Sequence, residues 1–543
     1  MNRREFLPKR QTMLESLEKH QEIDVLVIGA GINGCATFRD IAIQNSLSVL
    51  LVDKEDFGAG ASMASSRMAH GGLRYMENGE FRLTKEALTE RDRLLKHAGI
   101  AVYPQVMAIP FFSWFAGVVP AIKKIFGLPA KYSERGFVLA EVGLHFYDFY
   151  TRHQRQAPSH RFMGNTSATQ KFSGLHTAVK AVSTYFDGLI HSPERIALSL
   201  VSDGVKSNKS ALALNHMACV GSKNNSDIYN SVALRDTLTQ KQYFIKPKLI
   251  INATGAWIDN VGGTLQVSNQ YIGGTKGSHL VLDNPDLLHA LSGHGFVFDD
   301  GKGRMCITYP FEGKVILGAT DIPITNPDEA ECTDEEVDYL LKAIRVIFPG
   351  INVTHSHIRY RYAGVRPLPR SDSGITGEIS RDHSLHKDKP NNHDYSVLSL
   401  VGGKWTTYRA FAQEATDKVL SHFSQIRTVS TAHQPVGKMF LDLPYSPSAS
   451  EQEKRYGKYF STFQDFCSDN GEPELSHSIS RAEIEYLVRY EMAQTLEDIV
   501  FRRTNIAVKG ELTEPLVRWI AKELEALTKQ NTDIQAFIDQ HNL

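Results

Sequence analysis

The segment that decides the fold is Asp24-Val-Leu-Val-Ile-Gly-Ala-Gly-Ile-Asn-Gly34, in which a short apolar run ends in a glycine-rich turn. The run is typical of a buried parallel strand, and residues 32–44 after it are typical of a helix. Ser48-Val-Leu-Leu-Val52 has the composition of the next strand. The chain is therefore predicted to open with a βαβ unit.

The glycines of this unit predict a dinucleotide site. Gly29 permits the tight turn, Gly31 lets a pyrophosphate approach the backbone, and Gly34 lets helix and strand pack closely. Asp53 ends the second strand, where a carboxylate accepts hydrogen bonds from the adenosine ribose hydroxyls. The alternative is a glycine-rich turn in an unrelated α/β domain.

Length and composition bound the remaining possibilities. A chain of 543 residues exceeds one ordinary domain, so we expect two or three. Lys and Arg (60) nearly balance Asp and Glu (61), which excludes a global basic field and argues against a nucleic-acid partner. The five scattered cysteines include no C-x-x-C pair, which excludes a disulfide scaffold and a four-cysteine metal site. They suit a reducing compartment, so we expect a cytoplasmic location.

Two segments resemble targeting or membrane elements. Arg3-Arg4-Glu-Phe-Leu7 imitates a twin-arginine export signal, but polar residues follow it, so we expect a short leading helix instead. Residues 97–122 lack charged side chains, yet three prolines interrupt them, which argues against a membrane-spanning helix. Phe111-Phe-Ser-Trp-Phe115, followed by Lys123 and Lys124, is typical of an element in a bilayer interface. A buried core segment is the alternative.

Later strands are expected to return to the first βαβ unit. Residues 211–220 and 231–245 are strand-like and separated by a polar turn, which predicts a hairpin or a meander. Residues 248–252 and 393–401 predict two more strands. Because these strands lie far apart in the sequence, we expect the segments between them to form a second, interleaved domain.

A change of pattern marks the C-terminal part. Leu443-Pro-Tyr-Ser-Pro-Ser-Ala-Ser450 is rich in Pro and Ser, and beyond it the apolar spacing becomes helical. The spacing predicts one long helix over residues 484–500 and another over 516–527. We therefore place a helical domain at residues 441–543, after a nucleotide-binding domain with interleaved substrate-binding segments at residues 1–440.

Further motifs occur in a fixed order along the chain. They are His70-Gly-Gly-Leu-Arg-Tyr75, Asn252-Ala-Thr-Gly-Ala-Trp257, Lys276-Gly-Ser-His279, Gly318-Ala-Thr-Asp321, Gly364-Val-Arg-Pro367 and Gly402-Gly-Lys-Trp-Thr-Thr-Tyr-Arg409. In this order they closely resemble the FAD-dependent glycerol-3-phosphate dehydrogenases of the aerobic, quinone-linked type. Tyr490–Arg503 resembles the helical domain of that family. Asp321 and Trp405 depart from its usual residues.

The resemblance implies an α/β fold: a glutathione-reductase-like FAD-binding Rossmann domain, an interleaved antiparallel-sheet substrate domain and a C-terminal helical domain. The cofactor it implies is FAD, and it implies no metal. The candidate cofactor-binding residues are Gly29, Gly31, Gly34, Asp53, Ser65, Ser66, Thr254, Gly255, Gly402, Gly403, Lys404, Thr406 and Thr407. We expect Gly402 and Gly403 to open a helix whose first N–H groups face the flavin.

The candidate catalytic residues are cations and imidazoles within the same motifs. Arg366 is suited to bidentate capture of a phosphate, with Arg74 as a second cation, although a structural ion pair is the alternative for each. Lys404 is placed to reach the flavin edge or the substrate phosphate. His70 and His279 are the candidate general bases, and we prefer His70 because it lies in a flavin-contacting motif.

The function implied is oxidation of sn-glycerol 3-phosphate to dihydroxyacetone phosphate, with electrons passed through FAD to a membrane quinone. An oxidase that reduces oxygen is a close variant. A flavin-binding, membrane-associated protein with little turnover is the alternative from a different class. We expect a cytoplasmic enzyme held peripherally on the inner face of the membrane, and whether it forms a homodimer is left open.

Overall fold

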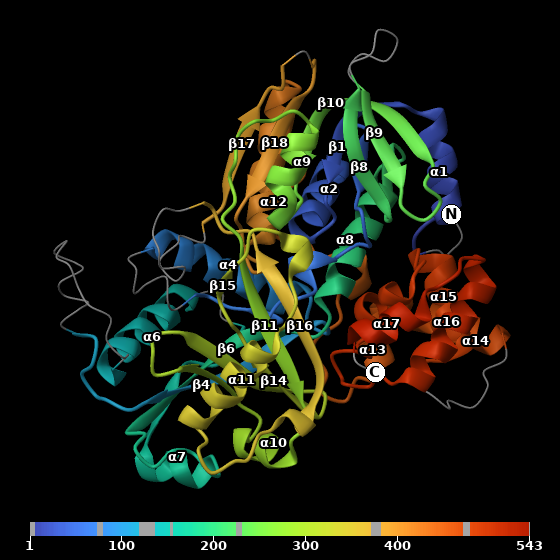
Figure 1. Ribbon diagram of the computed structural model, residues 1–543. Helices are drawn as coiled ribbons and strands as arrows, with labels where there is room; N and C mark the ends of the chain where they lie inside the picture. The colour runs from blue at the N-terminus through green and yellow to red at the C-terminus, as the bar shows by residue number, and fades with distance from the viewer. Residues whose placement is uncertain are drawn as a thin grey trace.

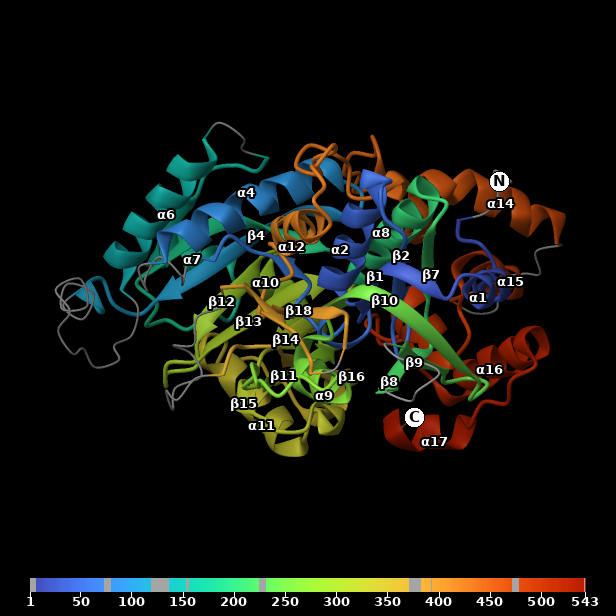
Figure 2. The same ribbon diagram turned by 90° about the horizontal axis from the view of Figure 1, so that it is seen from above.

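The protein is built from two sheets and a separate group of C-terminal helices (Figures 1 and 2). The computed structural model describes all residues except 1–5, 73–79, 119–135, 153–155, 224–230, 371–381, 392, 471–477 and 542. Arg3, Arg4, Arg74, Lys123 and Lys124 therefore lie outside the described residues. The leading helix is present as α1 (Arg10–Lys19).

The first sheet contains the nucleotide-binding turn and has the strand order β17-β18-β10-β1-β2-β7. Its strands are β1 (Glu22–Ile28), β2 (Val49–Val52), β7 (Ala211–Leu214), β10 (Gln242–Asn252), β17 (Ser384–Asp388) and β18 (Ser396–Val401). The four central pairings are parallel, and β17 is antiparallel to β18. The predicted hairpin is formed by β8 (Met217–Lys223) and β9 (Ser231–Asp236), and β9 also pairs with β10.

Helices cover the first sheet because its central strands are apolar on both faces. All four residues of β2 and all six of β18 are buried. Helix α2 (Ile32–Gln44) follows the glycine turn and packs against α8 (Pro193–Ser207) and α12 (Tyr408–His422). The expected βαβ unit and the interleaved return of distant strands are confirmed.

The second sheet is mostly antiparallel and has the strand order β15-β11-β14-β13-β12-β4-β6-β3, with β16 paired to β11 and β5 to β6. Its strands are β3 (Met68–Ala69), β4 (Val102–Phe111), β5 (Arg161–Gly164), β6 (Ala181–Ile190), β11 (Thr275–Leu282), β12 (Gly295–Asp299), β13 (Met305–Phe311), β14 (Lys314–Gly318), β15 (Ile322–Pro323) and β16 (Ile358–Arg366). Around it lie α4 (Phe81–His97), α6 (Phe137–Thr151), α7 (Asn165–Lys171), α10 (Pro285–Leu291) and α11 (Asp334–Ala343) (Figure 1).

The C-terminal helices form their own hydrophobic core on the side of the molecule opposite α6 (Figures 1 and 2). They are α13 (Glu451–Tyr456), α14 (Phe460–Asp469), α15 (Arg481–Glu491), a π-helical turn (Asp498–Arg503), α16 (Glu514–Thr528) and α17 (Ile534–His541). The predicted long helix over 484–500 is wrong, because Met492 adopts a left-handed conformation (φ 58°) and ends α15. The carboxylate of Asp498 then accepts the backbone N–H groups of Gln494 and Thr495 and starts the next turn.

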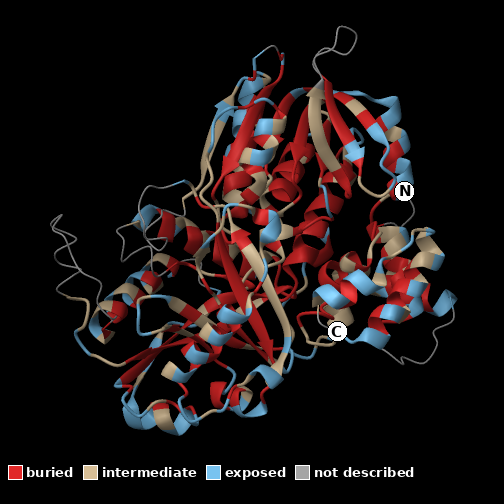
Figure 3. Ribbon diagram, viewed as in Figure 1, coloured by how far each residue is buried: buried red, intermediate tan, exposed pale blue. Residues whose placement is uncertain are grey.

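Buried charges join these helices to the first sheet. Asp56, in the loop after β2, accepts hydrogen bonds from Arg503 (Nη2–Oδ1 3.0 Å), Arg502 (Nε–Oδ2 3.3 Å) and Asn215 (Nδ2–Oδ1 2.8 Å). Both arginines and the aspartate are buried (Figure 3 shows the burial along the chain). A charge removed from water needs such partners, so the docking of the C-terminal helices is specific.

In the described part of the uncharged stretch, residues 97–118, a core strand is followed by an exposed tip. Strand β4 pairs with β6 along its whole length, and Phe111 is fully buried, which corrects its assignment to the bilayer interface. Trp114 and Phe115, by contrast, are 43% and 72% exposed. Within the described residues, no helix combines the length and the apolar character that crossing a membrane requires.

Candidate functional site

A cavity of about 900 Å³ lies where the two sheets meet, and the predicted site residues surround it. From the cofactor-binding set, its lining includes Gly29, Gly31, Asp53, Ser65, Ser66, Thr254, Gly255, Gly403 and Lys404. From the catalytic set, it includes His70, His279, Arg366 and Lys404. The lining does not include Gly34, Gly402, Thr406 or Thr407, and Arg74 falls outside the described residues.

The turn after β1 leaves no room for side chains. Gly29 has φ +97°, and a Cβ there would lie 2.6 Å from the carbonyl oxygen of Ala253. A Cβ on Gly34 would lie 1.8 Å from the carbonyl oxygen of Gly29. The first and third glycines are therefore required by the fold itself, whereas Gly31 lines the cavity.

Asp53 is held at the end of β2 with its carboxylate at the cavity. Its Oδ2 accepts the N–H of Ala30 (2.6 Å) and its Oδ1 accepts the N–H of Glu55 (2.9 Å). Burial raises the pKa of Asp53 to about 6, although these two backbone donors act in the opposite direction. A group that donates hydrogen bonds to this carboxylate, as ribose hydroxyls do, would favour its charged form.

The second glycine loop lies beside the first, because a Cβ on Gly403 would lie 3.0 Å from Nδ2 of Asn33. Gly402 (φ +74°) and Gly403 (φ +91°) turn the chain, but α12 begins only at Tyr408, so the glycines precede the helix rather than open it. In the described part of the chain, the buried Thr407 Oγ1 and Asn33 Oδ1 have no hydrogen-bond partner. Asn33 lines the cavity, so its unsatisfied Oδ1 fits the presence of a polar ligand group there.

The His70 loop is fixed by buried polar groups behind it. The N–H of Gly71 is donated to Tyr147 Oη (2.8 Å) and Asp187 Oδ1 (3.2 Å), and Tyr147 donates to the same carboxylate (2.6 Å). Thr406 Oγ1 accepts the N–H of His70 (3.1 Å). Thr406 therefore connects the motif that begins at Gly402 directly to the motif that begins at His70, and it helps to hold the His70 loop in place.

His279, on β11, is an uncharged imidazole at the cavity. Its ring stacks on Tyr362 (centroids 5.0 Å apart, planes 7° apart), and its Nε2 lies 2.7 Å from Ser66 Oγ. Burial, and next the cations Arg366 and Arg67, lower the pKa of His279 to about 3. The ring is therefore neutral at ordinary pH, and its Nδ1 has no partner among the described residues.

The guanidinium of Arg366 lies beside His279. Arg366 ends β16; its Nη1 contacts Asp321 Oδ1 (3.2 Å) and its Nη2 donates to the carbonyl of Thr320 (3.1 Å). The guanidinium covers Gly277, where a Cβ would lie 2.1 Å from Nη2. Gly277 and His279 are two residues apart on β11, so they share one face of the sheet. A fixed cation and a neutral imidazole thus adjoin each other at the cavity.

Three contributors to the site were not predicted from the sequence. Ser62 Oγ accepts the N–H of Ile32 at the start of α2 (2.8 Å). Tyr362 provides the stacking surface for His279, and Gly277 provides the space for Arg366. Gly277 belongs to the Lys276-Gly-Ser-His279 motif, but its contact with Arg366 depends on the pairing of β11 with β16 and cannot be read from the motif.

The turn after β1, Asp53 and the cavity between the two sheets define a dinucleotide-binding α/β protein. The sequence family described as "FAD dependent oxidoreductase" matches residues 24–417, well over half of the chain. The chain belongs to this family of FAD-dependent oxidoreductases, and its cofactor is FAD. A second family, "C-terminal domain of alpha-glycerophosphate oxidase", matches residues 398–531.

Individual relatives give a more specific comparison than the two family models. The chain is 32% identical over 522 residues to a glycerol-3-phosphate dehydrogenase of Synechocystis sp., covering 89% of each protein. It is 29% identical over 420 residues to the aerobic glycerol-3-phosphate dehydrogenase of Bacillus subtilis, covering 76% of this chain and 69% of that protein. The crystal structure of glycerol-3-phosphate dehydrogenase from Bacillus halodurans complexed with FAD aligns with a TM-score of 0.71 at 21% identity, covering 99% and 97% of the two chains. The expected fold is confirmed.

Proposed function

We propose that this enzyme oxidises sn-glycerol 3-phosphate to dihydroxyacetone phosphate. The observation that carries the proposal is the pairing of the Arg366 guanidinium with the neutral His279 at the cavity that the FAD-binding turn borders. FAD supplies the two-electron acceptor that takes a hydride from C2 of the substrate. The names of the relatives support the same substrate.

Arg366 is proposed to bind the substrate phosphate. A guanidinium offers a planar pair of N–H donors that matches phosphate oxygens. Its contacts with Asp321 and the Thr320 carbonyl fix its direction, so little side-chain freedom is lost on binding. Fixing the phosphate fixes the carbinol carbon relative to the imidazole, which is the positioning that transfer from carbon requires.

The proton of the C2 hydroxyl needs a base, and two histidines are candidates. His279 adjoins the proposed phosphate site and is uncharged at working pH, but its pKa of about 3 makes it a weak base. His70 also lines the cavity and sits in a loop held rigidly by Asp187, Tyr147 and Thr406. We therefore propose His70 as the base, with His279 as the alternative.

The remaining cofactor contacts are proposed from position. The loops with Ser65, Ser66, Thr254 and Gly255 line the cavity between the turn after β1 and β11. Lys404 has a buried Nζ in the loop after β18, a place where a cation stabilises negative charge on a reduced flavin. The division into residues 1–440 and 441–543 also stays a proposal.

A membrane quinone is the proposed electron acceptor, because an apolar surface lies at one end of the molecule. Helix α6 exposes Val138, Val142, Phe146 and Phe149, which share one face of the helix. Phe162, Trp114 and Phe115 are exposed as well. We call these seven side chains the apolar stripe, and we propose that it lies in the interface of the cytoplasmic membrane from the inner face. A homodimer is compatible with this placement, and sedimentation measurements would show whether one forms.

Two assays test this function. Purified holoenzyme should convert sn-glycerol 3-phosphate to dihydroxyacetone phosphate with a soluble quinone as acceptor, and glycerol should be a very poor substrate. Trp114→Ser with Phe115→Ser should reduce co-flotation with anionic vesicles, whereas Ile426→Ser, which removes an exposed apolar side chain elsewhere, should not. Undiminished flotation of the double variant would refute the interface.

Oxygen is the second candidate acceptor, favoured by the match to the alpha-glycerophosphate oxidase C-terminal family. The substrate chemistry is then unchanged, and hydrogen peroxide is released. Peroxide formed in proportion to substrate consumed, with no acceleration by quinone, would establish the oxidase and refute the quinone-linked enzyme.

A further inference from the structure

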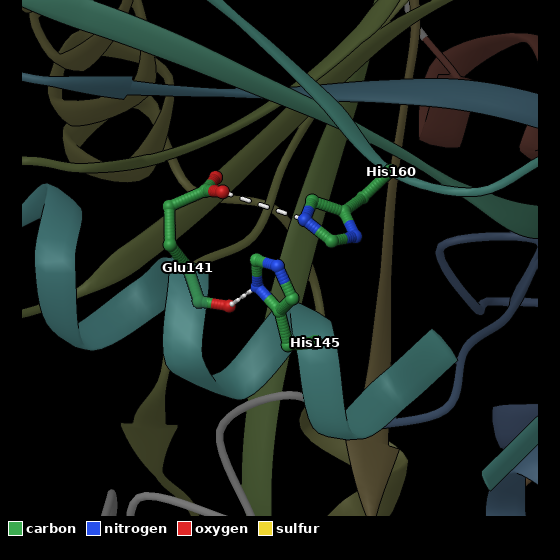
Figure 4. Close-up of side chains that lie close together, drawn as sticks. All are labelled: Glu141, His145 and His160. Atoms are coloured by element: carbon green, nitrogen blue, oxygen red, sulfur yellow. Dashed lines mark hydrogen bonds and ion pairs between the residues drawn. The ribbon is translucent and has the colours of Figure 1, made fainter. Parts of the chain in front are cut away.

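A second cluster of reactive side chains lies on α6 and just before β5, outside the cavity (Figure 4). Glu141, His145 and His160 each bring one ligand atom to within 4.8 Å of the others. Glu141 is buried, His160 is half-buried and His145 is exposed, so the cluster is open to solvent on one side. Nothing in the proposed oxidation uses these residues.

We propose that Glu141, His145 and His160 bind zinc or a similar divalent transition metal ion. Two histidines and one glutamate, with a fourth position open to water, are an established ligand set for zinc. Ligands ~2.1 Å from a tetrahedral metal lie ~3.4 Å from one another. His160 Nε2 and Glu141 Oε2 are 3.4 Å apart, so this pair already has the required separation.

The hydrogen bonds around the cluster engage Nδ1 of each imidazole, so Nε2 of each is available to bind the metal. His145 Nδ1 lies 2.8 Å from the carbonyl oxygen of Glu141. Because a carbonyl oxygen only accepts, Nδ1 carries the hydrogen and Nε2 of the neutral ring keeps its lone pair. His160 Nδ1 lies 2.8 Å from Asp148 Oδ2 in the same way. Carboxylate–histidine and carbonyl–histidine pairs of this kind orient metal ligands in known sites.

The glutamate is oriented too. Ser183 Oγ, on β6, donates to Glu141 Oε1, which leaves Oε2 facing His160. Figure 4 shows the three side chains gathered above α6, with His145 one helical turn after Glu141. His145–His160 ring centroids are 4.5 Å apart. The ligand atoms lie within 4.8 Å of one another, so the exposed His145 would move by at most about 1.4 Å to reach the tetrahedral separation of ~3.4 Å.

The position of the cluster suggests what the metal would do. It would tie α6 to the segment that enters β5, and α6 carries Tyr147, which holds the His70 loop through Gly71 and Asp187. We therefore assign the ion a positioning role for α6 and its apolar stripe. The ion takes no part in the oxidation.

The test uses tag-free holoenzyme, zinc alone as the probe, and elemental analysis after equilibrium dialysis. We expect one bound zinc per chain, loss of binding in His160→Ala and Glu141→Gln, and about 10–100-fold weaker binding in Asp148→Asn. His355→Ala is the matched control, because His355 Nε2 also pairs with a carboxylate (Asp338, 2.7 Å) but belongs to no cluster of three possible ligands among the described residues.

A second measurement needs no variant. Cobalt bound to the parent protein should give the intense visible absorption of a tetrahedral site, and zinc should displace it. The proposal would be overturned if the parent protein retained no zinc or gave an octahedral cobalt spectrum. It would also be overturned if His160→Ala and His355→Ala lost equal amounts of bound zinc. Retained flavin absorbance in each variant shows that it is folded.

Discussion

Replacing Gly277 by Ala should weaken the phosphate site without disturbing the fold. The added Cβ would lie 2.1 Å from Arg366 Nη2, 2.5 Å from Cζ and 2.6 Å from Nη1. Ordinary contact begins near 3.4 Å, so the guanidinium must move by about 1.3 Å. The clashing atoms belong to the far end of a flexible side chain, which can move while the strand stays in place.

The expected cost follows from the hydrogen bonds that the displaced guanidinium loses. A hydrogen bond to a charged group contributes about 1.5–3 kcal/mol, so kcat/KM for sn-glycerol 3-phosphate should fall by about 10–150-fold. Steady-state kinetics with a soluble dye acceptor measure this. Gly263→Ala is the control, because a Cβ at that glycine meets nothing within 4 Å.

A double-mutant cycle makes the test specific. If Gly277→Ala acts only by displacing the guanidinium, it should have no further effect in an Arg366→Ala background. An unchanged kcat/KM in Gly277→Ala, or the same loss with and without Arg366, would refute the placement of the phosphate site.

Four further predictions concern the cofactor, the base, the acid stability and the domain contact. Gly31→Val should give a folded but colourless protein, because a side chain there blocks the approach of the FAD pyrophosphate; stoichiometric flavin in the variant would contradict this. His70→Ala should slow anaerobic flavin reduction by about 10²–10⁴-fold if His70 is the base, and an unchanged rate in stopped-flow absorbance would transfer the role to His279. The folded-state pKa of His279 is about 3, below the unfolded value of 6.5, so its contribution to stability is complete above pH 6.5 and is lost as the pH falls towards 3. Between pH 8 and 5 the parent should lose about 2 kcal/mol more unfolding free energy than His279→Gln, and parallel urea-denaturation curves would argue against this. Arg503→Ala should destabilise the protein by about 3–5 kcal/mol because Asp56 loses a buried partner, and an unaltered denaturation midpoint would show that Arg502 compensates fully.

The first βαβ unit was predictable because every signal in it is local. The apolar run, the three glycines and Asp53 lie within thirty residues, so the whole pattern can be read from one short segment. The apolar spacing predicted α16 and the helical character of the C-terminal part, but it did not predict the end of α15. A left-handed Met492 leaves no trace in the apolar spacing.

Residues 97–122 could not be assigned from the sequence, since an uncharged run suits both a core strand and an interfacial segment. Only the pairing of β4 with β6 separates Phe111 from the exposed Trp114 and Phe115. The arrangement of the site was likewise only partly predictable from the sequence. His279 and Arg366 were both recognised from motifs, but their adjacency depends on the register of β11 and β16, which brings together residues far apart in the chain.

Anaerobic reduction of the bound flavin by sn-glycerol 3-phosphate tests the central claim most directly. The account predicts complete bleaching of the yellow holoenzyme by one equivalent of substrate, with dihydroxyacetone phosphate as product. The mirror-image phosphate ester and glycerol should bleach it far more slowly, because the first presents the wrong hydrogen and the second lacks the phosphate. A flavin that stays oxidised in excess sn-glycerol 3-phosphate, or that glycerol bleaches equally fast, would contradict the account.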